Sequence, residues 1–149
     1  MARKAGKFYG NSPAETANID QWLEFQNTQL GAVYPRSLYG TFGFMPVTKE
    51  NYEAGKKDTI SVLQIMDAQL KKTPYLAGND ISIADFACFP VIRLCMRLWI
   101  DEKLRNSIPN VVQWHNRVHD LKETTELFGK RWLCIREATP VFEEAEKKE

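Results

Sequence analysis

The amino-acid sequence predicts an all-α domain built around one buried helix at about residues 82–100. Apolar residues recur at spacings of three and four along most of the chain, as they do on the inward face of a helix. Helix-start signals precede three of these stretches, at Ser12, Ser82 and Asn110. The third observation is the stretch 86–100, which is apolar on nearly every side and is therefore expected in the middle of the domain.

The overall composition is that of one globular domain without a strong electrostatic field. The chain has 149 residues, of which 44% are hydrophobic and 26% are charged, and its net charge is +1. Such a balance gives no global attraction to nucleic acid or to an anionic membrane, so we predict neither as a direct partner. The longest apolar stretch contains Arg93 and Arg97 and is too short to span a bilayer.

The three cysteines lie in apolar surroundings, and no two of them form a Cys-x-x-Cys pair. Disulfides are rare in reducing compartments, where thiols persist. The cysteines therefore predict reduced, buried thiols in a cytoplasmic protein.

The first two helices are predicted from their start signals. The stretch SPAE at residues 12–15 combines a capping box with a proline in the first turn, and the helix after it is expected to end near Gly31. Residues 31–47 hold three glycines and two prolines among aromatics, which predicts an ordered connection that packs its aromatic rings. A second helix is expected to start at Thr48 and to end before Pro74.

The central helix begins at a second capping box. Ser82 is expected to accept a hydrogen bond from the Asp85 N–H, while the Asp85 carboxylate accepts one from the Ser82 N–H. Ile81 and Phe86 stand at the positions of a hydrophobic staple. A helix apolar all round needs this cap because water cannot reach its first N–H groups. Pro90 inside the helix predicts a kink.

Two later segments complete the predicted domain. Asn110 is expected to cap a helix with a box partner three residues later. Residues 123–138 predict one or two short helices with Trp132, Leu133 and Ile135 buried. Residues 142–149 form a charged tail.

Few side chains suggest chemistry. Ser82 and Asp85 could be a nucleophile and a base, but no histidine is near in sequence and the cap already uses both groups, so we interpret the pair as structural. His115 and His119 have the spacing of two metal ligands on one helix face. No third ligand is nearby, so we expect two solvated or hydrogen-bonded histidines. The residues predict no catalytic group and no metal site, and they favour a partner-binding module over an enzyme.

Three stretches carry a resemblance to a known family. YLAGNDISIADF at residues 75–86, SIPNVVQWHNRV at 107–118 and SPAETANIDQWLEF at 12–25 resemble the C-terminal, all-helical domain of the glutathione transferase family. In that family the capping box and staple help to fold the central helix, and the motif falls here on Ile81, Ser82, Asp85 and Phe86. The resemblance implies a helical bundle at residues 11–141.

The opening residues 1–10 are similar to the end of the thioredoxin-like domain that precedes the helical domain in this family. In the family, that domain binds glutathione and supplies the activating side chain. The resemblance therefore implies no catalytic residue and no cofactor for this chain alone, and glutathione only where such a domain is supplied. It also implies an exposed surface around Trp22, Arg93 and Arg97, where that domain would pack.

Within the family, YGTFGFMPVTKENYEAGKKDTISVLQIMDAQL at residues 39–70 and LFGKRWLCIREATPVFEEAEKKE at 127–149 resemble the gamma subunit of translation elongation factor 1. This resemblance implies a non-catalytic scaffold that anchors nucleotide-exchange subunits or an aminoacyl-tRNA synthetase. The alternatives are the hydrophobic-substrate half of a glutathione transferase and a structural subunit of a larger assembly. A homodimer is a further alternative for the partner.

Overall fold

The computed structural model describes residues 7–134, 140 and 142. Within these residues the chain is helical and contains no β-strand, which confirms the predicted all-α class. The elements are α2 (Pro13–Phe25), the π-helical turn η1 (Gln26–Leu30), α3 (Gly31–Phe42), α4 (Lys49–Leu70), α5 (Ile83–Leu98), α6 (Glu102–Ser107), α7 (Pro109–His119) and α8 (Lys122–Phe128).

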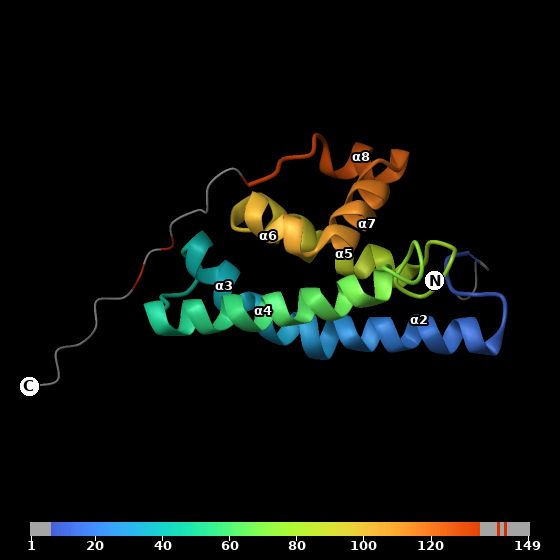
Figure 1. Cartoon of the computed structure of the whole chain (residues 1–149), viewed down its shortest axis with the longest axis horizontal. Coiled ribbons are helices and arrows are strands. Elements are labelled where there is room, and N and C mark those ends of the chain that lie inside the picture. Colours follow the sequence, from blue (N-terminus) through green and yellow to red (C-terminus); the bar gives the residue numbers. More distant parts are fainter. Residues whose placement is uncertain (1–6, 135–139, 141, 143–149) are drawn as a thin grey trace, which may run out of the picture.

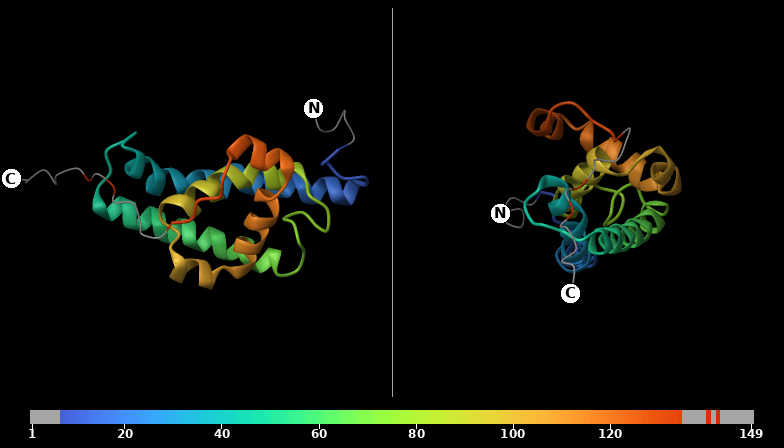
Figure 2. Two further views of the ribbon diagram at one scale, coloured as in Figure 1. Left: turned by 90° about the horizontal axis from the view of Figure 1, so that it is seen from above. Right: turned by 90° about the vertical axis from the view of Figure 1, so that its left-hand side faces the viewer.

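The helices are arranged in layers around α5. α2, η1 and α3 form one long rod, and α4 returns along it (Figure 1). α5 lies between this layer and the group formed by α6, α7 and α8 (Figure 2). The α5 side chains therefore make up much of the core, together with Tyr52, Leu63, Met66, Leu76 and Trp114, all of which are fully buried. No helix within the described residues is long and apolar enough to cross a membrane.

The predicted connection at residues 31–47 is wrong over most of its length. The backbone stays helical through Gly31, and α3 ends only at Gly43, whose positive φ of 68° provides the left-handed cap. The π-helical turn before Gly31 takes up one extra residue, since the Gly31 N–H donates to the Gln26 carbonyl. Pro35 lies in this helix, although it cannot donate a backbone hydrogen bond.

Close packing between α3 and α4 explains why the helix persists despite these residues. Gly55 of α4 lies against α3, where an added Cβ would come within 2.6 Å of the Arg36 Cβ and 3.2 Å of the Ser37 backbone nitrogen. The missing side chain lets the two backbones approach closely. Buried contacts along this crossing, with Leu38 on α3 and Leu63 on α4 in the core, outweigh the helix-breaking tendency of glycine and proline.

The N-terminus of α7 differs from the prediction in how it is capped. Asn110 is already inside α7, and the cap position is Ile108. The Asp67 carboxylate of α4 accepts hydrogen bonds from the Asn110 N–H at 2.7 Å and the Val111 N–H at 3.0 Å. A side chain from another helix thus supplies the cap that the sequence assigned to Asn110.

Several surface predictions also change. Trp22 is buried in the core, and Arg93 is bound to the end of α8, so of the three residues expected on an exposed face only Arg97 is exposed. Trp132 and Leu133 are exposed rather than buried. Ile135 lies outside the described residues, as do residues 1–6 and 143–149, so the assignments of both chain ends stay predictions.

We expect Gly55→Ala to lower the free energy of unfolding by about 1–3 kcal/mol, because the new methyl group would overpack the α3–α4 crossing. Helix propensity alone predicts the opposite sign, a gain of about 0.5–1 kcal/mol. Urea denaturation followed by circular dichroism measures the difference. Ser61→Ala, on the exposed side of α4, is the control and should change little. A more stable Gly55→Ala variant would contradict the close crossing.

Candidate functional site

The capping box of α5 is the first place where predicted site residues meet. Ser82 and Asp85 are buried, and both arms of the box are present. The Asp85 carboxylate accepts from the Ser82 N–H at 2.9 Å, and the Ser82 hydroxyl also donates to it at 3.0 Å. The second carboxylate oxygen accepts from the Leu76 N–H at 3.0 Å and from the Trp114 indole N–H at 2.8 Å. Four hydrogen bonds thus hold this one carboxylate.

This arrangement fits a structural role for the pair. The Ser82 hydroxyl is fully enclosed and has no imidazole beside it, and the carboxylate has no accepting capacity left for a substrate proton. The outer part of the motif also involves a residue from the start of the chain. Phe86 packs edge-on against Phe8, with ring centroids 5.5 Å apart. Ile81 packs against the core, and a direct contact between Ile81 and Phe86 stays a prediction.

The sequence predicted two solvated or hydrogen-bonded histidines, and the structure buries both His115 and His119. Their ring nitrogens make no hydrogen bond within the described residues, and the His115 ring stacks on Phe89 at a centroid distance of 5.2 Å. Burial is the main cause that lowers the His115 pKa to about 4, and the neighbouring Asn116 acts in the opposite direction. The smaller effects of His119, Arg131 and Arg93 lower the pKa further.

The charges around this pair are mixed. The Asp120 carboxylate lies 3.5 Å from the His119 Nδ1 and is also paired with Arg131 at 2.7 Å. Within residues 7–134, 140 and 142 no group of three or more histidine, cysteine, aspartate or glutamate side chains gathers into a metal-binding cluster.

The three cysteines are buried free thiols, as the sequence predicted. Burial raises the pKa of Cys88 and of Cys95 to about 12, and the Asp85 charge adds to the effect at Cys88. Thiols with such high pKa values stay protonated at neutral pH and are poor nucleophiles.

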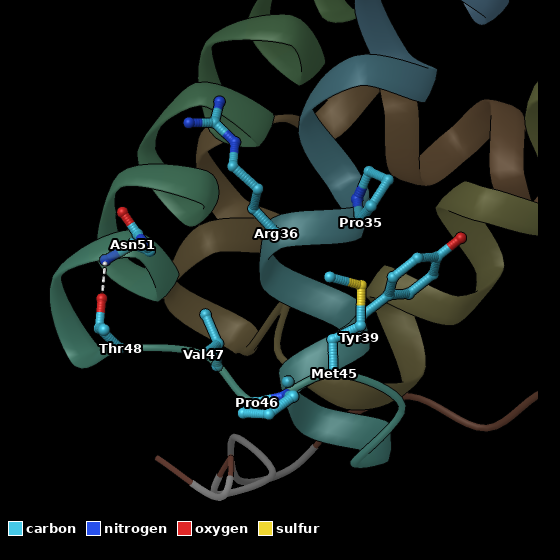
Figure 3. A pocket seen from close by; sticks show the side chains of 9 residues that line it. Pro35, Arg36, Tyr39, Met45, Pro46, Val47, Thr48 and Asn51 are labelled. Atoms are coloured by element: carbon cyan, nitrogen blue, oxygen red, sulfur yellow. Dashed lines mark hydrogen bonds between the residues drawn. The ribbon is translucent and has the colours of Figure 1, made fainter. Parts of the chain in front are cut away.

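An apolar groove of about 330 Å³ lies at the end of the α3–α4 pair (Figure 3). Pro35, Arg36 and Tyr39 reach it from α3, Met45 and Pro46 come from the connecting loop, and the start of α4 closes it (Figure 3). The wall at α4 is fixed by the Thr48 cap, whose hydroxyl accepts from the Asn51 N–H at 3.2 Å (Figure 3). Arg36 is held by an ion pair with Asp58 at 2.5 Å.

Large apolar side chains project beside this groove. Phe44 is 72% exposed and Met45 is 57% exposed, and the Phe42 and Phe44 rings stack at a centroid distance of 5.4 Å. We call Phe42, Phe44 and Met45 the tip patch. The sequence predicted that this segment packs its aromatic rings. The rings of Phe42 and Phe44 do pack on each other, but both side chains are exposed to solvent. The alternation of glycine and phenylalanine in GTFGF, residues 40–44, was the sequence signal for this exposed segment.

The groove has the chemistry of a binding surface. Its lining contains no carboxylate, imidazole, thiol or amine that could exchange a proton near neutral pH, and its one guanidinium is already paired. Proline, aromatic and methionine side chains instead provide a contact area that adapts to a partner's apolar groups.

The sequence profile described as "Glutathione S-transferase, C-terminal domain" matches residues 21–121, more than half of the chain. The chain belongs to this family. The identification confirms the predicted resemblance, and the matched range contains the capping box and the helices α4, α5 and α7.

Solved family structures agree on the fold. The glutathione S-transferase-like domain of elongation factor 1-gamma from Saccharomyces cerevisiae superposes with a TM-score of 0.84 over 93% of this chain and 64% of that chain. Because its sequence is only 18% identical, the match bears on the fold alone. Poplar glutathione transferase F1 matches with a TM-score of 0.70 at 25% identity, over 80% of this chain and 56% of that one.

Curated relatives in the family fall into different functional classes. The chain is 25% identical to a valine–tRNA ligase of Takifugu rubripes over 90% of its own length and 11% of the ligase. It is 25% identical to elongation factor 1-gamma of Sus scrofa, over 87% of the chain and 30% of the factor. It is 27% identical to the glutathione S-transferase stcT of Emericella nidulans, over 80% of the chain and 56% of the transferase. The chain thus spans well under two thirds of each of these relatives.

We expect Ser82→Ala to lower the free energy of unfolding by about 0.5–2 kcal/mol, because one cap hydrogen bond is lost. Asp85→Leu should cost more than Asp85→Asn, since an amide oxygen can still accept some of the four hydrogen bonds. Urea titrations of the three variants test this order. Equal stability of Ser82→Ala and the parent chain, or a more stable Asp85→Leu, would show that the box does not hold α5.

We also expect the domain to lose stability in mild acid through His115. Above pH 6.5 the imidazole is neutral in the folded and unfolded chains alike. Between pH 6.5 and about 4 only the unfolded chain binds the proton, so the free energy of unfolding falls as the pH falls. The loss from this residue should reach about 2 kcal/mol at pH 5.

Denaturant titrations from pH 7.5 to 5 measure this effect, and His115→Phe should remove that part of the pH dependence. A phenylalanine can keep the stacking on Phe89 without taking up a proton. The same pH dependence in the parent and the variant would contradict a buried neutral His115.

Proposed function

We propose that this chain is a non-catalytic scaffold domain that anchors partner proteins in an assembly of the translation machinery. The observation that carries the proposal is the groove with its tip patch, which offers apolar contact area and no proton-exchanging group. Exposed apolar patches of this kind mark interaction sites on soluble proteins. The partners we propose are the nucleotide-exchange subunits of elongation factor 1 or an aminoacyl-tRNA synthetase, in the cytoplasm.

The relatives support this proposal through what they have in common. A region like this chain makes up 11% of a valine–tRNA ligase and 30% of elongation factor 1-gamma. Aminoacylation and the work of an elongation factor are different activities, so a domain present in both is better explained by a shared partner-binding task than by a shared reaction. Both names belong to translation, which gives the proposed assembly.

A second candidate is the hydrophobic-substrate half of a glutathione transferase. The similarity to the stcT transferase over 56% of that protein favours it. In this alternative the apolar groove would hold the second substrate, and glutathione would bind to a thioredoxin-like domain supplied by another part of the protein. The two candidates differ in one measurable property, which is conjugating activity.

We expect the purified chain to form a complex with purified exchange subunits or with a synthetase in sedimentation velocity, and to conjugate glutathione to a chlorinated aromatic substrate no faster than a protein-free control. Phe44→Ser should weaken the complex about tenfold, because exposed aromatic anchors dominate interface energies. Ile65→Ser is the matched control, since it removes another exposed apolar side chain far along α4 from the loop.

The outcomes separate the candidates. Conjugation above the control without complex formation would overturn the scaffold proposal in favour of the transferase. A complex that tolerates Phe44→Ser but is lost in Ile65→Ser would keep the scaffold and move the docking surface away from the tip patch.

A further inference from the structure

A second exposed surface lies where α8 ends and the chain turns back along α5. Leu127 is 76% exposed and Trp132 is 63% exposed, and Leu133 is also in solvent. Trp132 differs in this from Trp22, Trp99 and Trp114, which are all buried. We call Leu127, Trp132 and Leu133, together with the exposed cations Arg97 and Lys130, the Trp132 patch.

The backbone that carries this patch is held in place at both of its ends. The Arg93 guanidinium donates to the Phe128 carbonyl at 2.8 Å and lies 5.0 Å from the centre of the Phe128 ring. At the other end the Cys134 N–H donates to the Met96 carbonyl at 2.7 Å, and Arg105 donates to the Cys134 carbonyl at 2.8 Å. The segment is therefore anchored at residues 128 and 134, which limits the conformational freedom of the residues between them and so the ordering cost of binding.

The charge around this segment is positive and only partly neutralised. Residues 91–98 of α5 and residues 127–134 contain four arginines and lysines and no acidic residue, and the exposed Glu126 next to Leu127 is paired with Lys122 at 3.8 Å. Arg131 is paired with Asp120 at 2.7 Å. Arg97 and Lys130 have no acidic partner among the residues that the structure describes. Burial lowers the pKa of Arg93, and the nearby charge of Arg97 lowers it further.

We propose that the Trp132 patch binds an acidic segment of a partner protein, in which apolar side chains alternate with carboxylates. Trp132 and Leu127 would provide the apolar anchors, and Arg97 and Lys130 would pair with carboxylates at the edge. An apolar centre with a charged rim is the usual anatomy of a protein interface, and tryptophan is prominent among its energetic anchors. The proposal rests on a surface distinct from the tip patch and does not depend on the scaffold function.

Two other classes of ligand fit the patch less well. Single-stranded nucleic acid binds to several stacked aromatic rings along a basic groove, and this patch offers one exposed ring beside two leucines. Recognition of an anionic lipid surface typically takes a cluster of about 4–8 basic residues, and the Trp132 patch has two, Arg97 and Lys130. Leucine and tryptophan anchors between two cations match an acidic amphipathic peptide better than either.

The test uses a short fluorescein-labelled amphipathic peptide with leucines on one face and glutamates on the other. Fluorescence anisotropy should show saturable binding to the whole chain that weakens as the salt concentration rises. The emission of Trp132, obtained as the difference between the parent and Trp132→Phe, should shift to shorter wavelength when the peptide binds. Arg97→Glu combined with Lys130→Glu should weaken binding about tenfold.

Two control variants and two control ligands complete the experiment. Lys57→Glu and Ile65→Ser change an exposed cation and an exposed apolar side chain elsewhere, and binding should stay the same within error. A peptide with lysine in place of glutamate should not bind. Circular dichroism confirms that each variant is folded, which is expected because all of the changed side chains are exposed.

The proposal fails if the lysine peptide binds as tightly as the glutamate peptide. It fails also if the double charge reversal leaves the affinity unchanged, or if the Trp132 emission does not respond to bound peptide. Tighter binding to vesicles of phosphatidylserine and phosphatidylcholine, or to a single-stranded oligonucleotide, than to the glutamate peptide would assign the patch to a membrane or to nucleic acid instead.

Discussion

The Asp85 carboxylate is the group on which the packing of the domain depends. Its two oxygens accept hydrogen bonds from the start of α5, from the Leu76 backbone before it and from Trp114 of α7. The start of α5, the loop before it and the distant helix α7 are therefore tied to one buried carboxylate. A carboxylate in an apolar interior is tolerated only where its lone pairs are satisfied, so these donors must all be in place for α5 to occupy the centre. The core therefore packs around this carboxylate and its donors.

Counting the hydrogen bonds and the burial of each polar group also separates structural from functional groups in this protein. Ser82 and Asp85 are fully used by the fold, and burial holds His115 and the thiols of Cys88 and Cys95 in their neutral forms. Strongly shifted pKa values often mark active sites, but here they arise in the core from desolvation. Two exposed surfaces carry large apolar side chains: the groove with its tip patch at the α3–α4 loop and the Trp132 patch beside α8.

These surfaces exist because side chains from separate helices fix exposed backbone in definite positions. The close α3–α4 crossing at Gly55 sets the position of the loop that carries the tip patch. Arg93, on the buried helix, fixes the end of α8 that leads to Trp132. An exposed aromatic side chain on an anchored backbone can bind a partner at a lower ordering cost. This advantage is consistent with a family whose helical domain recurs in a tRNA ligase and an elongation factor.

The sequence by itself determined the helical class, the central helix and its cap, because these follow from periodicity and from hydrogen bonds between residues three apart. It also determined that the three cysteines are buried. Only the tertiary structure decided that the helix continues through Gly31 and Pro35, that Asp67 caps α7, and that Trp132 lies outside while His115 lies inside. Each of these depends on contacts between residues far apart in the chain, whose packing energy exceeds the local preferences that a sequence pattern records.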